Sequence, residues 1–252
     1  MRSETNGLVD AHCHVDMYPD PEGIAREADR QRIATIAVTN LPSHYRLLSA
    51  HLKNYRSVHP ALGLHPLLAE RHGAERSDFQ KLAGKARFIG EVGLDHSEAG
   101  KGTEHEQQVS FRVVLESINK CPRFVTVHSR GAEPLVLDLL SEYQVTPVVL
   151  HWYSGSIACL DRAVEMGHYF SVNPAMIRNA KGKALISRMP KERVLTESDG
   201  PYCQVGRQAA RPWDVSMVLA GLSILWDMPS PSVIQQVHCN AVALMSFSHS
   251  VP

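Results

Sequence analysis

Eight short apolar runs recur along this chain and restrict its fold more than any other feature. They are rich in Val, Ile, Leu and Phe, and most lack the polar alternation of a sheet with one solvated face, which is typical of strands buried on both faces. The runs span residues 8–12, 33–39, 57–65, 87–93, 123–129, 146–152, 168–174 and 193–199. The third run is the weakest prediction, because Pro60 interrupts it.

Segments with apolar residues at helical spacing separate several of these runs, at 22–32, 105–120, 132–143 and 156–166. Strand–helix alternation repeated over about two hundred residues predicts an α/β fold, a (β/α)8 barrel of the TIM type. The alternative is an open doubly wound sheet, which needs only about five or six strands. After residue 199 we expect no further strand: 199–214 is loop-like, and 214–228 and 230–247 form helices that close the barrel. No linker divides the chain, so residues 1–252 are expected to form a single domain.

Composition narrows the possible functions. The formal net charge is +0, so the chain lacks the basic excess of proteins that coat nucleic acids, and any such contact should be local, at a cleft. The five cysteines are scattered without a CxxC pair, which argues against a disulfide framework or a structural zinc knuckle and favours a reducing cytosol. The start MRSETNGLVD lacks the apolar segment of a signal peptide, and no stretch reaches the ~18 apolar residues of a membrane span. We therefore expect a cytoplasmic protein without a membrane segment.

Ionisable side chains stand at or near the ends of the apolar runs, where a barrel places its active site. They are His12, His14, Glu91, His128, His151 and Asp199. His12 and His14 are two residues apart, so their side chains point to the same face of a strand, roughly 6.6–6.8 Å apart along it. Six such ligands exceed the needs of one tetrahedral zinc and suit two metal ions about 3.5–4 Å apart. Glu91 is the natural bridge, because a carboxylate has two oxygens.

Each of these residues also has a purely structural interpretation. A lone histidine at a strand end is more often a hydrogen-bonded core residue than a ligand. Glu91 can be half of a buried ion pair, and Asp199 before Gly-Pro can form a turn. All six together are hard to explain in this way. Trp152 and Tyr153, which follow His151, can either stack on a base or pack in the core.

The motifs DAHCHVD, GLHP, GEVGLD, HSRGA, HWYSG and TESDGPY resemble, in that order, those of the TatD-family metal-dependent deoxyribonucleases, a group of amidohydrolase-like metallo-hydrolases. The resemblance covers about residues 8–202, and the ending NAVALMSF is also similar. Matched residue by residue, it implies one metal held by His12, His14 and Asp199, a second held by His128 and His151, and a bridge formed by Glu91. It also implies that His65 of GLHP and Arg130 of HSRG lie near the substrate phosphate. A core or capping role for His65 and an exposed surface role for Arg130 are the alternatives.

The resemblance implies hydrolysis of phosphodiester bonds in DNA by a binuclear mechanism, with Asp199 and Glu91 as catalytic residues. Four imidazoles and two carboxylates fit Zn, Mn, Ni or Co, and Mg less well. Because the chain is neutral overall, we expect exonuclease-like action on single-stranded or frayed DNA. Two alternatives use the same ligands: hydrolysis of an amide, lactone or nucleobase substrate, and a metal-bound assembly subunit of a larger complex.

Two loops depart from the family pattern. GLDHSEAG lacks the aromatic residue that usually follows GLD, and RQAARPWD replaces the usual RN.P stretch. These loops shape the substrate cleft, so the departures concern the substrate more than the metal chemistry. The segment YFSVNPAM and the divergent tail resemble most closely those of QatD, the TatD-like component of the bacterial Qat anti-phage system. That similarity implies other proteins of such a defence system as partners.

Overall fold

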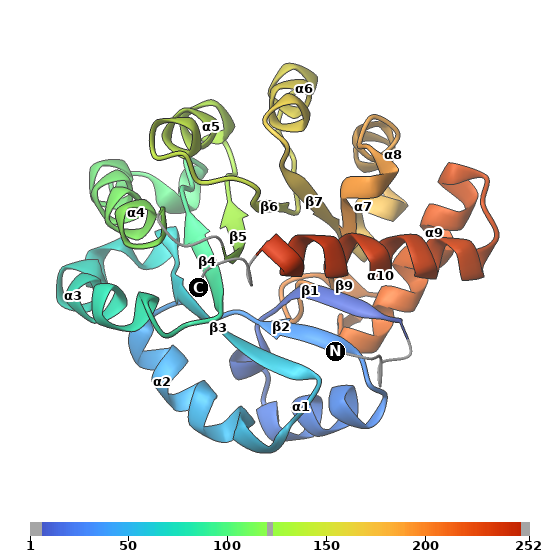
Figure 1. Cartoon of the computed structure of the whole chain (residues 1–252), viewed down its shortest axis with the longest axis horizontal. Helices are drawn as coiled ribbons and strands as arrows, with labels where there is room; N and C mark the ends of the chain where they lie inside the picture. Colours follow the sequence, from blue (N-terminus) through green and yellow to red (C-terminus); the bar gives the residue numbers. More distant parts are fainter. Residues whose placement is uncertain (1–6, 120–122, 248–252) are drawn as a thin grey trace.

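Eight parallel strands form the centre of this computed structural model, which describes residues 7–119 and 123–247 (Figure 1). They follow one another around the ring in chain order: β1 (Val9–Cys13), β2 (Ala34–Ala37), β3 (Val58–Leu64), β4 (Phe88–Gly93), β5 (Phe124–His128), β6 (Val149–His151), β7 (Tyr169–Val172) and β8 (Val194–Thr196). Each predicted strand is present, and the (β/α)8 prediction is confirmed over the open-sheet alternative.

Hydrogen bonds just beyond the regular strands close the ring between β8 and β1. The backbone N–H of Asp199 donates to the carbonyl of His12 at 2.9 Å. The N–H of His14 donates to the carbonyl of Gly200 at 2.8 Å. Because these bonds join the first and last strands at the histidine pair, they fix three of the predicted ligands relative to one another.

Pro60 lies inside β3 and does not end it. The strand pairs with β2 as far as Pro60, opposite Ala37, and with β4 from Ala61 onwards. Proline lacks an N–H, which is most costly where a strand is bonded on both sides. Here it stands where the pairing passes from one neighbour to the other, so the strand tolerates it.

Helices surround the strands (Figure 1): α1 (Pro21–Arg30), α2 (Pro42–His51), α3 (His72–Ala83), α4 (Glu104–Ile118), α5 (Glu133–Glu142), α6 (Ile157–Glu165), α7 (Pro174–Arg178) and α8 (Ala180–Ile186). The four predicted helices are α1, α4, α5 and α6; the end of the second prediction, Lys120, lies outside the described residues. The sequence pattern did not single out α2, α3, α7 or α8. Phe79, Phe111, Phe124 and Phe170 are among the largest fully buried side chains.

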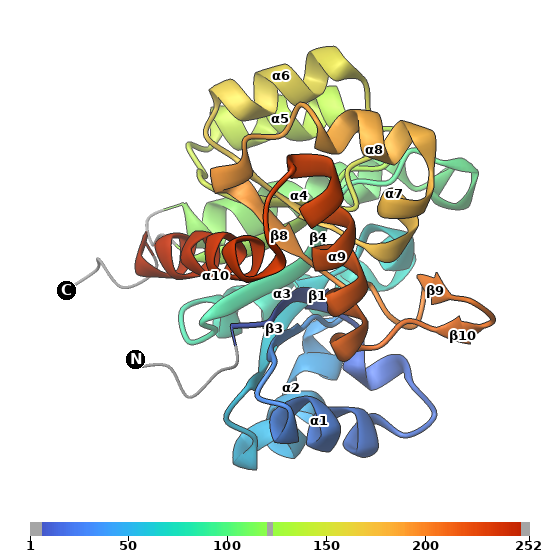
Figure 2. The same cartoon turned by 90° about the vertical axis from the view of Figure 1, so that its right-hand side faces the viewer.

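The last third of the chain corrects one prediction. A short hairpin, β9 (Gln204–Val205) with β10 (Gln208–Ala209), follows β8 where no strand was expected, and it projects from the barrel in Figure 2. Its turn is Gly206–Arg207, with Gly206 at φ +63°, a conformation that glycine adopts readily. This two-residue Gly-X turn was the available signal, but strands of two residues are too short to show an apolar pattern.

Two further helices, α9 (Val215–Trp226) and α10 (Ser230–Phe247), complete the fold. Helix α10 lies across the end of the barrel where the strands begin (Figure 1). The Asn240 amide on α10 donates to the carbonyls of Lys191 and Val194 at 2.7 and 2.8 Å, at the start of β8. The predicted closing helix is therefore confirmed, and it leaves the opposite end free for a site.

Across residues 7–119 and 123–247, no single helix is long and apolar enough to cross a membrane. The segments Pro212–Trp226 and Ser230–Ser246 meet the length and composition criteria only as a pair, and they are bent by 108° relative to each other.

Candidate metal centre

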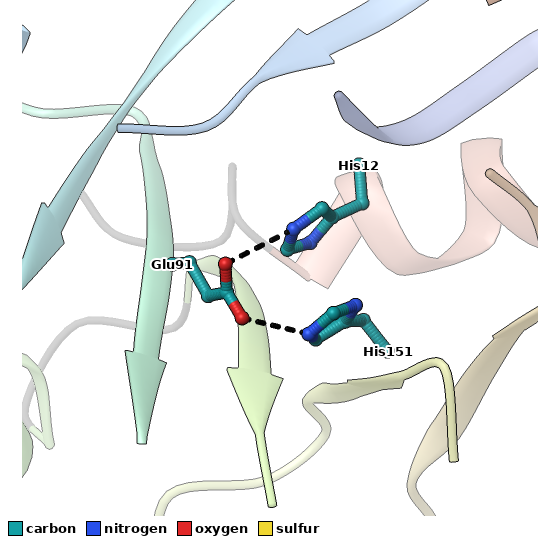
Figure 3. Close-up of side chains that lie close together, drawn as sticks. All are labelled: His12, Glu91 and His151. Carbon is teal, nitrogen blue, oxygen red and sulfur yellow. Dashed lines mark ion pairs between the residues drawn. The ribbon is translucent and has the colours of Figure 1, made fainter. Parts of the chain in front are cut away.

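The six predicted metal ligands converge at the ends of the strands, around Glu91 of β4. Figure 3 shows Glu91 between two of them, His12 and His151. Its Oε1 lies 2.6 Å from Nδ1 of His128 and 2.7 Å from Nε2 of His151. Its Oε2 lies 3.0 Å from Nε2 of His14 and 3.4 Å from Nε2 of His12. The two oxygens of one buried carboxylate therefore face two different pairs of imidazoles, which is the geometry required of a bridge.

The spacing around His12, His14 and Asp199 fits one cation. The two Nε2 atoms are 3.3 Å apart, and Asp199 Oδ1 lies 3.6 Å from that of His12 and 3.8 Å from that of His14. Ligands held 2.0–2.1 Å from a tetrahedral metal are about 3.3 Å from one another. The observed separations equal that value or exceed it slightly.

The ring of His12 is oriented for this role. Its Nδ1 lies 2.8 Å from the hydroxyl of Thr126, which turns Nε2 towards the site. Burial lowers the pKa of His12 well below its usual range, and the neighbouring His151 lowers it further. The imidazole therefore stays neutral and keeps a lone pair, as a metal ligand must.

The second pair of imidazoles is supported by buried carboxylates. The Nδ1 of His128 lies 3.2 Å from Nε2 of His151. The far nitrogen of His128 lies 2.7 Å from Oδ2 of Asp95, and that of His151 lies 3.7 Å from Oε2 of Glu197. The Asp95 contact is a hydrogen bond of the kind that commonly fixes the ring orientation and tautomer of a metal-ligating histidine, whereas Glu197 lies beyond hydrogen-bond distance of His151.

The sequence analysis missed both supporting carboxylates. Asp95 ends the third motif, GEVGLD, four residues after Glu91, and Glu197 stands two residues before Asp199 in TESD. The same two-residue alternation that paired His12 with His14 was available to find Glu197. Glu197 also accepts hydrogen bonds from the Trp152 N–H and the Asn173 amide at 3.1 and 3.0 Å, and from the Ser171 hydroxyl.

Glycines on both sides of Glu91 bring β4 close to β5. A Cβ on Gly90 would lie 2.1 Å from Cγ2 of Thr126, and one on Gly93 would lie 2.0 Å from the carbonyl oxygen of His128. Their φ angles, +152° and +136°, also favour glycine. Any larger residue would push the two strands apart and separate Glu91 from His128.

The electrostatics of the centre favour cations. Burial alone would raise the pKa of Glu91, but the surrounding imidazoles, foremost His65 and His151, hold it well below its usual range. Burial opposes protonation of His151, yet Glu91 and Glu197 raise its pKa well above the ordinary value. In the metal-free protein, protons on His128 and His151 balance the charge of the carboxylates, and metal binding would displace those protons.

Asp199 differs from Glu91 in its protonation. It is 3% exposed and has a left-handed backbone, with φ 45°. Burial raises its pKa well above the usual range; His151 opposes the shift, and Glu197 reinforces it. A carboxylate with a raised pKa is a stronger proton acceptor than an ordinary aspartate, which suits it to accept a proton during a reaction.

His65 lies beside the centre, with its Nε2 as a hydrogen-bond donor. Its Nε2 is 3.2 Å from Glu91 Oε2, and its Nδ1 accepts the N–H of Leu67 at 3.1 Å. Burial lowers the pKa of His65, so the ring is neutral and its single proton sits on Nε2. The Nε2 of His65 therefore faces the Glu91 carboxylate, and His65, Glu91 and His128 form a group whose ligand atoms lie close enough to hold a metal ion; the substrate contact stays a prediction.

The centre opens into a pocket of about 740 Å³. Exposed Arg130 lines it, as does Lys181 of α8, whose Nζ donates to the carbonyl of Ser154 at 2.6 Å. Trp152 also lines the pocket, whereas Tyr153 is 1% exposed and packs edge-on against Phe170 with ring centroids 5.9 Å apart. Of the two aromatic residues, only Trp152 is placed to meet a substrate.

Known proteins show the same fold and family. The model of the family described as TatD related DNase matches residues 9–246. The human protein named Deoxyribonuclease TATDN3 is 27% identical over 264 residues, covering 97% of this chain and 96% of the relative. The metal-dependent hydrolase YjjV of Escherichia coli K12 is 27% identical over 258 residues, covering 95% and 98% of the two chains.

Solved structures agree. The crystal structure of YjjV, described as a TatD homologue, superposes with a TM-score of 0.85 at 25% identity and covers 98% of this chain and 99% of its own. A TatD-family hydrolase from Entamoeba histolytica shares the fold at a TM-score of 0.82 and 15% identity, with 96% and 99% covered. The motifs, the converging ligands and these matches lead to one conclusion: the chain belongs to the TatD-related DNase family of metal-dependent hydrolases.

Proposed function

We propose that this protein hydrolyses phosphodiester bonds of DNA at a centre for two divalent cations. The observation that carries the proposal is the division of the ligands by Glu91, whose two oxygens face two separate imidazole pairs. The name of the human relative, a deoxyribonuclease, supports DNA as the substrate. The E. coli relative is named a metal-dependent hydrolase, which supports the cofactor.

We assign the ligands to two sets as the family resemblance implies, and the distances around Glu91 support this division. One cation would be held by His12, His14 and Asp199, the other by His128 and His151, with Glu91 shared. Divalent cations bound here would lower the pKa of a water towards ~7 and neutralise charge on the phosphoryl oxygens. The imidazole-rich donor set favours Zn, Mn, Ni or Co over Mg.

The chain's own groups supply the remaining chemistry. Asp199 orients the attacking water, accepts its proton and returns it to the leaving oxygen. Its buried carboxyl is suited to this, because its pKa is raised. His65 donates its Nε2–H to a non-bridging phosphoryl oxygen, and Arg130, exposed at the pocket, pairs with a neighbouring phosphate.

The net charge of the chain indicates which form of DNA, single-stranded or duplex, the pocket favours. With a formal net charge of +0, the chain has no broad basic surface to hold a duplex. A small number of phosphate contacts inside one pocket favours a flexible end or a short single strand, and hence exonuclease-like cleavage. Few counterions would be released, so cleavage should depend only weakly on salt.

The test compares a linear single strand with its covalently closed circle, using metal-loaded protein at two salt concentrations. We expect cleavage of the linear form, little cleavage of the circle and a weak salt dependence. Equal cleavage of both forms, or a steep salt dependence, would contradict the exonuclease proposal. A panel of amide and lactone substrates is assayed in parallel; hydrolysis of those alone would overturn the nuclease proposal itself.

An anti-phage role with partner proteins of a Qat-type system, and a cytoplasmic location, stay predictions. The segment YFSVNPAM that suggested QatD forms β7 and the start of α7. Its Ser171 and Asn173 donate to Glu197, behind His151. This segment therefore supports the metal centre from inside the barrel, and it does not by itself indicate a surface that binds a partner protein.

A further inference from the structure

A residue that lines the pocket has a buried hydrogen-bond acceptor without a partner in the described part of the chain. Asn40 follows β2, is 8% exposed and lines the pocket beside the metal centre. Its backbone carbonyl accepts the N–H of His65 at 2.9 Å, so its position at the strand end is fixed. Its side-chain Oδ1 is buried, and nothing within residues 7–119 and 123–247 donates to it. Buried acceptors are almost always paired, so this one calls for a donor that enters the pocket.

Tyr202 forms the adjoining wall of the pocket. Its side chain is 54% exposed, and its ring stands edge-on to that of His14, with centroids 4.9 Å apart and planes at 90°. Asn40 and Tyr202 both line the pocket, so the unpaired oxygen and the aromatic ring belong to the same wall.

The chemistry of a nucleotide decides what can satisfy this acceptor. A phosphodiester at neutral pH carries only acceptor oxygens, so it cannot donate to Oδ1. Donors occur on the nucleoside: N–H groups on the base edges and O–H at a free end of the sugar. A half-exposed aromatic ring beside the acceptor suits the flat face of a base. A phosphate at the cations would place its own nucleoside within reach, because Tyr202 contacts the ligand His14.

We propose that Asn40 and Tyr202 form a nucleoside subsite next to the metal centre. Asn40 Oδ1 accepts an N–H or O–H from the nucleotide whose phosphate is cleaved, and the Tyr202 ring packs against that nucleoside. The inference rests on the proposed nuclease function, and it makes Asn40 a specificity-determining residue rather than a catalytic one.

The test uses Asn40→Leu, which keeps the branched shape of the side chain and removes its acceptor together with its amide donor. Two substrates are compared on metal-loaded protein: a short single-stranded DNA, and bis(p-nitrophenyl) phosphate, a phosphodiester without any N–H or O–H donor. We expect the ratio of kcat/KM for DNA to that for bis(p-nitrophenyl) phosphate to fall roughly 5- to 20-fold, as for loss of one hydrogen bond that leaves its partner unpaired. An unchanged ratio would overturn the subsite.

Two modified DNAs identify the donor. One has an abasic nucleotide on either side of the cleaved bond, and the other has a 3′-deoxy end. If the base donates, wild type and Asn40→Leu should cleave the abasic DNA equally well; if the sugar hydroxyl donates, they should cleave the 3′-deoxy DNA equally well. If the variant remains impaired to the same degree on both, the amide acts through something other than the nucleoside and the subsite is wrong.

Tyr202 supplies a second pair of variants, which does not depend on how Asn40→Leu folds. Because Tyr202 is more than half exposed, its replacement should leave the fold intact. Tyr202→Leu should lower kcat/KM for the DNA, whereas Tyr202→Phe, which keeps the ring, should stay closer to wild type. Equal behaviour of the two variants would contradict packing against the ring. Wild-type protein that cleaves neither phosphodiester would instead refute the proposed nuclease function.

Discussion

Asp95→Asn should weaken one of the two cation positions selectively. Asp95 is 1% exposed, and its Oδ2 lies 2.7 Å from the far nitrogen of His128. Its other oxygen accepts the N–H of Ser97 at 2.8 Å, so the carboxylate is held on both sides. Burial alone would raise the pKa of Asp95, but hydrogen bonds from His128 and Ser97 hold it below its usual range. The side chain is therefore a fixed negative charge behind one proposed ligand.

The size of the effect follows from this single contact. Asparagine keeps an oxygen that accepts from His128 but loses the charge that makes the imidazole a stronger donor to a cation. Mutation of such outer carboxylates typically costs 10- to 100-fold in metal affinity, or about 1.4–2.8 kcal/mol. Only the cation at His128 and His151 should be affected, because no contact links Asp95 to His12 or His14 among the described residues.

Calorimetric titration of the metal-stripped protein with Zn²⁺ measures both positions. Asp29→Asn is the matched control. The Asp29 carboxylate, on α1, also accepts hydrogen bonds, from the N–H groups of Arg56 and Ser57 at 2.8 and 2.7 Å, but these residues stand just before β3 and not at the metal centre. We expect one of two binding constants to fall in Asp95→Asn and neither to fall in Asp29→Asn. Equal weakening of both constants, or no change in either, would refute the carboxylate–histidine reasoning.

Two other predictions concern catalysis and stability. Asp199→Asn removes a ligand and the proposed proton acceptor, so kcat/KM for single-stranded DNA should fall by more than the 10²–10⁴ typical of general-base removal; a smaller loss at saturating metal would argue against both roles together. Burial lowers the pKa of His168 to about 4, and its Nδ1 accepts the Val148 N–H at 3.3 Å. His168 takes up a proton near pH 6.5 in the unfolded chain but only near pH 4 in the folded protein. The free energy of unfolding that neutral His168 contributes above pH 6.5 is therefore lost as the pH falls towards 4, by up to about 3 kcal/mol. His168→Gln should flatten this part of the dependence in urea unfolding, and an unaltered slope would show that His168 is not responsible.

Much of the barrel was predictable, because its strands are buried on both faces and appear as apolar runs. Even β3 was identified despite Pro60. The helices were harder to predict. Helix α3 buries His72, Phe79 and Ala83, so its apolar stripe is interrupted and its pattern is weak. Helix packing against the barrel, and not periodicity in the sequence, defines such an element.

The candidate site was predictable in part, for a similar reason. The proposed ligands are charged or imidazole side chains at the ends of apolar strands, where they are conspicuous. Their supports are not: Asp95 and Glu197 gain their roles only because the fold brings them behind His128 and His151. Asn40 is neutral and its sequence context is unremarkable, so only its buried, unpaired oxygen points to a role.

The central claim is that Glu91 joins two cation positions in one centre. The most direct measurement is elemental analysis of the purified protein after dialysis, for wild type, Glu91→Gln and His14→Ala, with folding checked by circular dichroism. Wild type should carry two divalent ions per chain, His14→Ala should lose mainly one, and Glu91→Gln should lose occupancy at both positions. A wild-type protein with a single ion, or equal metal loss in the two variants, would contradict the account.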